Sequence, residues 1–494
     1  MDCEVAVVGG GIGGLTVAAL LSQRGVDVCL LERESQLGGC TASVAKFGYT
    51  FECSDGLYTG WTDGDIHSRI FAALPVDPPE TRLLHPGYVV RLPDGSSVSV
   101  TADLGEFENE LVRVFPECRE PALAFYRRLS AISATLRNIL DSNPSFLSSS
   151  STRKALSLAT HGPTGLQILK HAKDTTSQHL NEASTRFRRF IDIQLQTLAQ
   201  GDSSQVSYLY SSLALINPGG MFAIRGGAAG LATRLGESIT RSGGKVRLNS
   251  PVLRLSYNSA GEAQGVDLLS GETVRASRAV VSNLTIWDTY GKLIGLNRTP
   301  TAIRKQMNAL RGWGAYLVYA GVEEAAAAAL PGDRLLELTA WQEDSDYDPE
   351  AAQLTVATAP AWDPRAPEGK RAVTIHTFTD VDRWFTFHRD ETEHEETDQQ
   401  MLEVVWQRLH KALPELGSGI EVIDTATPRT YYDQTRRKLG MVGGIPVTPE
   451  LFWESDPAHV TSLPNVFLVS DTSSPGGVAG VSKAALVLAD HLSK

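Results

Sequence analysis

Residues 5–14 read Val5-Ala6-Val7-Val8-Gly9-Gly10-Gly11-Ile12-Gly13-Gly14. The first four are apolar and mostly β-branched, a pattern typical of a strand that is buried on both faces. The glycines that follow contain the spacing G-x-G-x-x-G. Between a buried strand and a helix, this spacing indicates a turn that holds the pyrophosphate of a dinucleotide.

Each glycine of this spacing has its own steric role. Gly9 permits the tight turn, Gly11 lets the backbone approach a pyrophosphate, and Gly14 allows the helix to pack closely on the strand. The start of that helix offers unpaired N–H groups and the positive end of its dipole to the phosphates. We therefore predict that the cofactor is bound by Gly9, Gly11, Ile12, Gly13 and Gly14.

Glu32 and Arg33 follow the second apolar run of this unit, residues 26–31. A carboxylate at this point would accept a hydrogen bond from a ribose 2′-OH and would repel the 2′-phosphate of NADP. We predict that Glu32 binds the ribose and that Arg33 contacts the diphosphate; a solvated surface position is the alternative for Arg33. A purely structural turn is the alternative for the whole unit, and the order strand, turn, helix, strand and acid disfavours it.

A second unit of the same kind occurs near the other end of the chain. Residues 465–471 form an apolar run that ends in Asp471, and a glycine-rich turn and a helical pattern follow it. The turn reads Pro475-Gly476-Gly477-Val478-Ala479-Gly480. A helix that starts after such a turn is a second site for negative charge. A helix-capping role is the alternative for Asp471.

Gly38-Gly39 come shortly after Glu32 and complete the pattern E-R-x-x-x-x-G-G. This continuation resembles the amine-oxidase and phytoene-desaturase superfamily of flavoproteins. The resemblance implies that the dinucleotide is FAD and that Gly38 and Gly39 help to bind it. A plain turn is the alternative for these two glycines.

The same resemblance assigns roles to the C-terminal unit. It implies that Asp471 contacts the ribityl–diphosphate and that Gly477 and Val478 face the flavin O2 and N1. Some amine oxidases attach the flavin through a cysteine near this turn, but residues 465–490 contain neither Cys nor His. We therefore predict that FAD is bound non-covalently.

Three segments between the two ends resemble the carotenoid isomerase and phytoene desaturase family in particular. They are residues 47–60, 226–283 and 427–446. The resemblance implies that the backbone of Val252 meets the adenine and that the third segment approaches the flavin face. The first segment departs from the family at Cys53-Ser54-Asp55, where a glycine-proline pair is usual.

This outline predicts an α/β fold with a discontinuous Rossmann-type FAD-binding domain and a second, α+β substrate-binding domain. The FAD-binding domain is assigned to residues 1–75, 217–285 and 458–494, and the substrate-binding domain to residues 76–216 and 286–457. A hairpin is predicted around Pro93-Asp94-Gly95, and helices are predicted over residues 187–198 and 401–413.

Charge and composition bear on partners and location. A formal net charge of -12 argues against nucleic acid and against electrostatic capture by anionic lipid. No apolar run approaches the roughly 20 residues of a membrane-spanning helix, while peripheral contact with a membrane through an apolar surface stays open. Five cysteines without a C-x-x-C pair, and an N-terminus without a signal pattern, favour a cytoplasmic location. The oligomeric state is not indicated.

No residue stands out as a catalytic acid or base, and the catalytic residues stay unknown. The resemblance of the third segment would bring Tyr431, Tyr432, Arg436 and Lys438 near the flavin, against the commoner packed or solvated roles of such residues. No metal site is predicted. His388 and His394 lie among carboxylates, but a solvated acidic loop or helix start is the favoured interpretation.

Trp313, Tyr316 and Tyr319 are spaced as neighbours on a helical face. They could line a pocket, and packing in the core is the favoured interpretation.

The leading hypothesis is an FAD-dependent oxidoreductase, either a desaturase or a redox-neutral isomerase, that acts on an isoprenoid polyene or a similar apolar small molecule. The second hypothesis is an amine oxidase or a desaturase of a soluble secondary-metabolite intermediate, which the polar segment 170–205 favours. The third is a non-catalytic prenyl-carrier chaperone, which the intact glycine and acid pattern disfavours.

Overall fold

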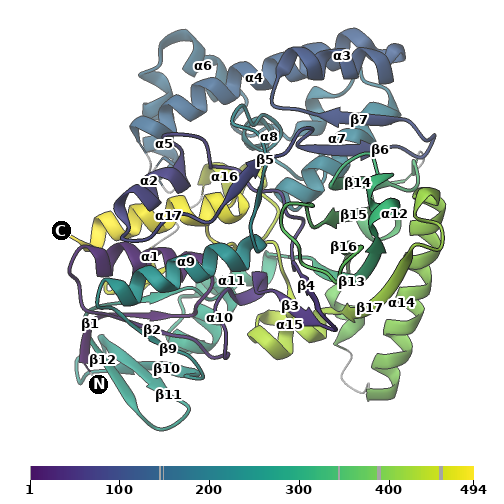
Figure 1. The fold of residues 1–494 in the computed structure, drawn as a ribbon. Helices are drawn as coiled ribbons and strands as arrows, with labels where there is room; N and C mark the ends of the chain where they lie inside the picture. The colour runs from purple at the N-terminus through teal and green to yellow at the C-terminus, as the bar shows by residue number, and fades with distance from the viewer. Residues whose placement is uncertain (1, 144–145, 148, 343–344, 386–390, 455–459) are drawn as a thin grey trace.

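The computed structural model describes residues 2–143, 146–147, 149–342, 345–385, 391–454 and 460–494. Two seven-stranded sheets organise these residues, each covered by helices (Figure 1). The predicted α/β fold is confirmed.

The first sheet is built from the two ends of the chain and from its middle. Its strand order is β10-β11-β12-β1-β2-β9, with β18 paired to β12. The strands are β1 (Asp2–Val8), β2 (Val28–Leu31), β9 (Lys245–Arg247), β10 (Val252–Tyr257), β11 (Ala263–Leu268), β12 (Thr273–Ser282) and β18 (Val466–Leu468). Strand β1 is parallel to β2 and β12, and β18 is parallel to β12, so their carboxyl ends meet at one edge.

Strand β1 is buried on both faces, as its sequence predicts. Val5 and Val7 pack in the cluster that includes the helices, whereas Ala6 and Val8 pack in the cluster on the opposite face. This division follows from the alternation of side chains along a strand. The helices on the first face are α1 (Ile12–Gln23), α2 (Ile66–Ala73), α9 (Gly227–Arg241) and α17 (Gly477–Leu492) (Figure 1).

The second sheet has the order β17-β13-β16-β15-β14-β6-β7. Its strands are β6 (Tyr88–Arg91), β7 (Ser97–Val100), β13 (Gly314–Glu323), β14 (Arg334–Leu338), β15 (Gln353–Thr358), β16 (Lys370–Thr379) and β17 (Ile420–Ala426). Strands β6 and β7 form the predicted hairpin. Helix α14 (Glu391–Ala412) packs on one face through Val405 and Leu409.

Residues 314–323 form a strand, so the helical spacing assigned to Trp313, Tyr316 and Tyr319 is wrong. The run is apolar and buried from Gly314 to Val322, which is the pattern of a central strand rather than of an amphipathic helix. Tyr316 packs with the α14 cluster and Tyr319 with the opposite cluster, as strand alternation requires. The predicted core packing is confirmed for Tyr316 and Tyr319, which are buried, whereas Trp313 is half-buried.

A helical layer covers the β6–β7 end of the second sheet (Figure 1). It consists of α3 (Leu104–Val114), α4 (Arg119–Ser142), α5 (Ser151–Ala159), α6 (Gly162–Lys170), α7 (Thr185–Ala199), α8 (Tyr208–Leu215) and α16 (Pro449–Glu454). Helix α7 includes the predicted helix 187–198. The remaining strands and α-helices are β3 (Val44–Lys46), β4 (Tyr49–Phe51), β5 (Thr81–Leu83), β8 (Phe222–Ile224), α10 (Ile286–Asp288), α11 (Thr301–Ala309), α12 (Glu324–Ala328), α13 (Pro349–Ala352) and α15 (Pro428–Thr435).

The strands of the first sheet all fall within residues 1–75, 217–285 and 458–494, and those of the second within 76–216 and 286–457. The division of the chain into two domains at these boundaries stays a prediction. Among the described residues, no helix combines the length and the apolar character needed to cross a lipid bilayer.

Candidate functional site

A cavity of about 1210 Å³ lies where residues of the two sheets and the helical layer meet. One part, here called the nucleotide side, is lined by the turns after β1, β2 and β18 and by the start of α17. The other part, here called the apolar side, is lined by residues of α8, β13 and β16. The carboxyl ends of parallel strands are the usual place for a ligand in such a sheet.

The glycine turn after β1 has the geometry that its sequence predicts. Gly9 has a φ of +99°, which favours glycine, and a Cβ built on Gly14 would lie 2.3 Å from the Gly9 carbonyl oxygen. Gly14 therefore lets α1 start directly against the turn. Asn283, at the end of β12, donates from Nδ2 to the Val469 carbonyl over 2.6 Å and so links the strands beside the turn.

Glu32 closes the same turn from the end of β2. Its carboxylate accepts hydrogen bonds from the backbone N–H of Gly10 at 2.6 Å and of Glu34 at 2.9 Å. Burial raises the pKa of Glu32, and these two N–H donors oppose that shift. The carboxyl group lies on the nucleotide side, where a ribose hydroxyl would be a further hydrogen-bond donor.

The two carboxylate oxygens of Asp471 show whether the site suits a nucleotide ligand. One oxygen, Oδ2, accepts from Arg437 Nη2 at 2.7 Å. The other, Oδ1, is buried and has no hydrogen-bond partner among the residues that the structure describes. A buried acceptor without a partner is costly unless a ligand supplies the donor, as hydroxyl groups of a ribityl chain would. Gly477 and Val478 line the cavity at the start of α17, where free N–H groups suit negative charge.

The apolar side carries several hydrophobic side chains and a few polar ones. The hydrophobic residues include Leu213, Ala214, Met221, Leu317, Phe378 and Val447, and the polar residues include Asp55, Gln200, Asn217 and His376. Burial lowers the pKa of His376 to about 4, so this imidazole is neutral at pH 7.

Asp55 faces the cavity but is surrounded by protein. Its Oδ1 accepts from the Leu57 N–H at 3.1 Å. Burial raises the pKa of Asp55 to about 6, and this backbone hydrogen bond opposes the shift. This shift brings the pKa of Asp55 closer to neutral pH than that of an exposed aspartate.

A comparison with protein families shows which family the chain belongs to. The profile of the family described as "Flavin containing amine oxidoreductase" matches residues 12–492. The chain belongs to that family. It is an FAD-dependent oxidoreductase. The ligand that could supply a donor to the buried Asp471 oxygen is therefore a flavin cofactor.

Curated relatives of this FAD-dependent oxidoreductase include a chloroplastic prolycopene isomerase 2 from an Oncidium hybrid cultivar. It is 25% identical over 506 residues, which cover 99% of this chain and 84% of that protein. An all-trans-retinol 13,14-reductase from Danio rerio is 24% identical over 98% of this chain and 85% of its own length. The predicted resemblance to carotenoid isomerases and desaturases is confirmed.

Among solved structures, an oxidoreductase from Methanosarcina mazei matches with a TM-score of 0.66 and 17% identity, over 99% of this chain and 100% of that chain. At this identity the likeness shows the fold alone.

The fold brings nearly all the predicted binding residues to the cavity of this oxidoreductase. Gly9, Gly11, Ile12, Gly13, Glu32, Arg33, Gly38, Gly39, Val252, Asp471, Gly477 and Val478 line it. Gly14 does not line the cavity; it packs against the Gly9 carbonyl group behind the turn. Arg33 also pairs with Glu34 at 3.1 Å. Contact of these residues with the cofactor stays a prediction.

The third resembling segment lies partly at the cavity. Tyr431, Tyr432 and Arg436 line it. Lys438 does not; its Nζ lies 5.2 Å from the ring centre of Trp287. Arg437 lines the cavity and pairs with Asp471, a role that the sequence could not assign because the two residues belong to distant segments.

The acidic stretch around His388 is only partly described. His388 itself lies outside the described residues, and Glu393 to Glu396 belong to the first turns of α14. The structure thus agrees with a helix start at this point.

Proposed function

We propose that this oxidoreductase binds FAD non-covalently and desaturates, or isomerises without net redox change, an isoprenoid polyene or a similar apolar substrate. One observation carries the proposal: the nucleotide side and the apolar side belong to a single cavity. An elongated apolar molecule could therefore reach the flavin without entering water. The prolycopene isomerases that match 99% of this chain support the polyene class.

The residues of the nucleotide side would hold the cofactor as follows. Glu32 would accept from the ribose, the start of α1 would face the diphosphate, and Asp471 would accept from the ribityl chain through its unpartnered Oδ1. Gly477 and Val478 would face the flavin ring. When bound, the flavin supplies the hydride or electron chemistry that a polyene needs.

The apolar side would orient the substrate and exclude water. Phe378 and Leu317 come from neighbouring strands of the second sheet, and Leu213 and Ala214 come from α8. Apolar walls of this kind bind a polyene by removing its surface from water, at about 25 cal/mol per Å². They would also keep water from reactive charge that develops during the reaction.

The test uses the purified flavin-loaded protein with a phytoene-type and a cis-polyene substrate, each with oxidised and with reduced flavin. A change in the polyene absorption spectrum is expected. A change that consumes oxidised flavin indicates desaturation, and one that needs reduced flavin but leaves its redox state unchanged indicates isomerisation. Failure of every polyene together with turnover of an amine would overturn the proposal.

Non-covalent attachment has its own test. Acid or heat denaturation should release yellow FAD into the supernatant, and the precipitated chain should have the mass of its sequence alone. Flavin that remains with the chain would contradict this part of the proposal. The absence of Cys and His in residues 465–490 supports release.

A second candidate is an amine oxidase, because the carboxylate of Asp55 could pair with an ammonium group at the cavity. Asp55→Asn separates the two candidates. Binding of a hydrocarbon polyene should change little, whereas binding of an amine should fall by at least about tenfold, the equivalent of 1.4 kcal/mol. The chaperone hypothesis is disfavoured, because the residues predicted to bind flavin are present and all of them except Gly14 line one cavity.

Location and membrane contact are further proposals. All five cysteines are free, which supports a reducing, cytoplasmic compartment. Leu156 on α5 and Leu166 on α6 are exposed, at 66% and 51%, and support peripheral contact with a bilayer that holds an apolar substrate. Co-sedimentation with neutral phosphatidylcholine vesicles tests this, and Leu156→Gln with Leu166→Gln should reduce it.

A further inference from the structure

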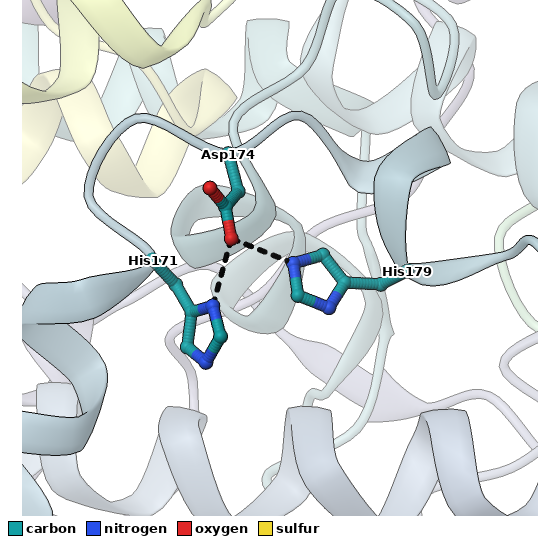
Figure 2. Close-up of side chains that lie close together, drawn as sticks. All are labelled: His171, Asp174 and His179. Atoms are coloured by element: carbon teal, nitrogen blue, oxygen red, sulfur yellow. Dashed lines mark hydrogen bonds and ion pairs between the residues drawn. The ribbon is translucent and has the colours of Figure 1, made fainter.

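Three side chains that can bind a metal lie together away from the flavin cavity, on the segment between α6 and α7 (Figure 2). His171 follows the last residue of α6, Asp174 lies three residues on, and His179 is the last residue of the 3₁₀ helix η3 (Thr176–His179). None of the three lines the flavin cavity.

One nitrogen of each histidine lies next to the same carboxylate oxygen, Asp174 Oδ2. His171 Nδ1 lies 2.7 Å from Asp174 Oδ2, and His179 Nε2 lies 3.0 Å from the same oxygen. All three donor atoms lie within 4.8 Å of one another. Figure 2 shows both rings turning a nitrogen toward the one carboxylate oxygen. Tetrahedral zinc would place such atoms about 3.4 Å apart, given bond lengths of about 2.0–2.1 Å, so small side-chain movements suffice.

The ligand set is held in place before any metal arrives. The Tyr208 ring stacks on His179, with ring centres 3.5 Å apart and an angle of 8° between the planes. The Tyr208 N–H donates to the Asp174 carbonyl at 2.9 Å, and the Thr176 N–H donates to the Val206 carbonyl at 2.9 Å. Because Tyr208 is buried, these contacts fix the segment against α8. Prior fixing of ligands lowers the entropy cost of binding.

A second cavity gives access to the cluster. It has a volume of about 510 Å³ and is lined by His171, His179 and Tyr208, together with Arg128, Gln178 and Glu182. A metal with three protein ligands keeps a fourth position for water, and this cavity is where that water would sit.

We propose that His171, Asp174 and His179 bind a divalent transition metal, Zn²⁺ in the first place, with one open position toward the second cavity. Two imidazole nitrogens and one carboxylate oxygen are the donor set that zinc accepts. The competing account is a purely structural cluster, in which both imidazoles donate to Asp174 and no metal binds.

The test is equilibrium dialysis of the flavin-loaded chain against Zn²⁺ alone. The wild-type chain should retain zinc, and His171→Ala and Asp174→Asn should each lose more than about tenfold in affinity. His161→Ala is the matched control, because His161 lies at the start of α6 and its Nδ1 contacts the Ser157 carbonyl instead. Equal affinities of His171→Ala and His161→Ala, or no zinc retained by the wild type, would overturn the proposal.

A second measurement needs no variant and so does not depend on their folding. Zinc should slow the reaction of diethyl pyrocarbonate with His171 and His179, read by peptide mass spectrometry, and should leave the rate at His161 unchanged. Co²⁺ in place of Zn²⁺ should give a visible absorption band of a four-coordinate nitrogen and oxygen site. Unprotected histidines would favour the structural account.

Discussion

Arg437 donates from Nη2 to Asp471 Oδ2 over 2.7 Å, and this ion pair joins the segment after α15 to the turn before α17. Arg437 also donates from Nε to the Met441 carbonyl at 2.6 Å. Burial alone would lower the pKa of Arg437, but nearby groups, Asp471 foremost among them, more than offset it and raise the pKa overall. Asp471 Oδ2 is thus paired with Arg437, while Oδ1 has no partner among the described residues and can accept a hydrogen bond from a ligand.

Replacing Arg437 with Met should reduce both stability and flavin retention. Asp471 would then lose its charged partner in a mostly buried position, which costs about 1–3 kcal/mol. Urea unfolding gives the stability, and the ratio of flavin to protein absorbance after gel filtration gives the retention. Arg436→Met is the control for stability: Arg436 is 44% exposed and pairs with exposed Asp433, so it should cost less than about 1 kcal/mol. Equal losses in the two variants would contradict the role of the pair.

Asp55→Asn should change how stability depends on pH. The pKa of Asp55 is raised from 3.8 to about 6, so the folded state favours the protonated form. The protonated carboxyl group therefore contributes fully to the free energy of unfolding below pH 3.8, and this contribution is lost as the pH rises through about 6. The Asn variant should therefore match the wild type near pH 4 and be more stable by about 2–3 kcal/mol at pH 7.5. Urea unfolding between these pH values measures the difference, and exposed Asp63→Asn should show no such trend.

Gly14→Ala should damage the flavin turn. The new Cβ would lie 2.3 Å from the Gly9 carbonyl oxygen, so the turn or α1 must move. A loss of about 1–3 kcal/mol in unfolding free energy is expected, with weaker flavin binding. Gly291→Ala is the control, because a Cβ there meets nothing within 4 Å. Normal flavin content and stability in Gly14→Ala would show that the close packing is dispensable.

Local sequence patterns were sufficient to predict which residues line the nucleotide side. Gly9, Glu32 and Asp471 each end or follow a buried strand, and strands that are parallel bring their ends to one edge. The order of elements along the chain therefore contained the information that places these residues together.

The apolar side and the second cavity could not be predicted in this way. Asp55 lies in a segment without periodicity, and its environment depends on distant residues such as Arg334. His171 and His179 belong to a short irregular segment whose shape is set by contacts with Tyr208 on α8. The spacing of Tyr316 and Tyr319 suggested a helix, because aromatic residues three positions apart also occur by chance in a buried, mostly apolar strand.

The pairing of β18 with β12, and the packing of α17 on α1, have a consequence for biosynthesis. A ribosome releases β1 and the glycine turn long before it has made the strand and helix that complete the flavin site. A nascent chain can thus fold much of its first sheet and still lack Asp471. Cofactor loading should accordingly wait until β18 and α17 have been made, and chains truncated shortly before β18 should be colourless.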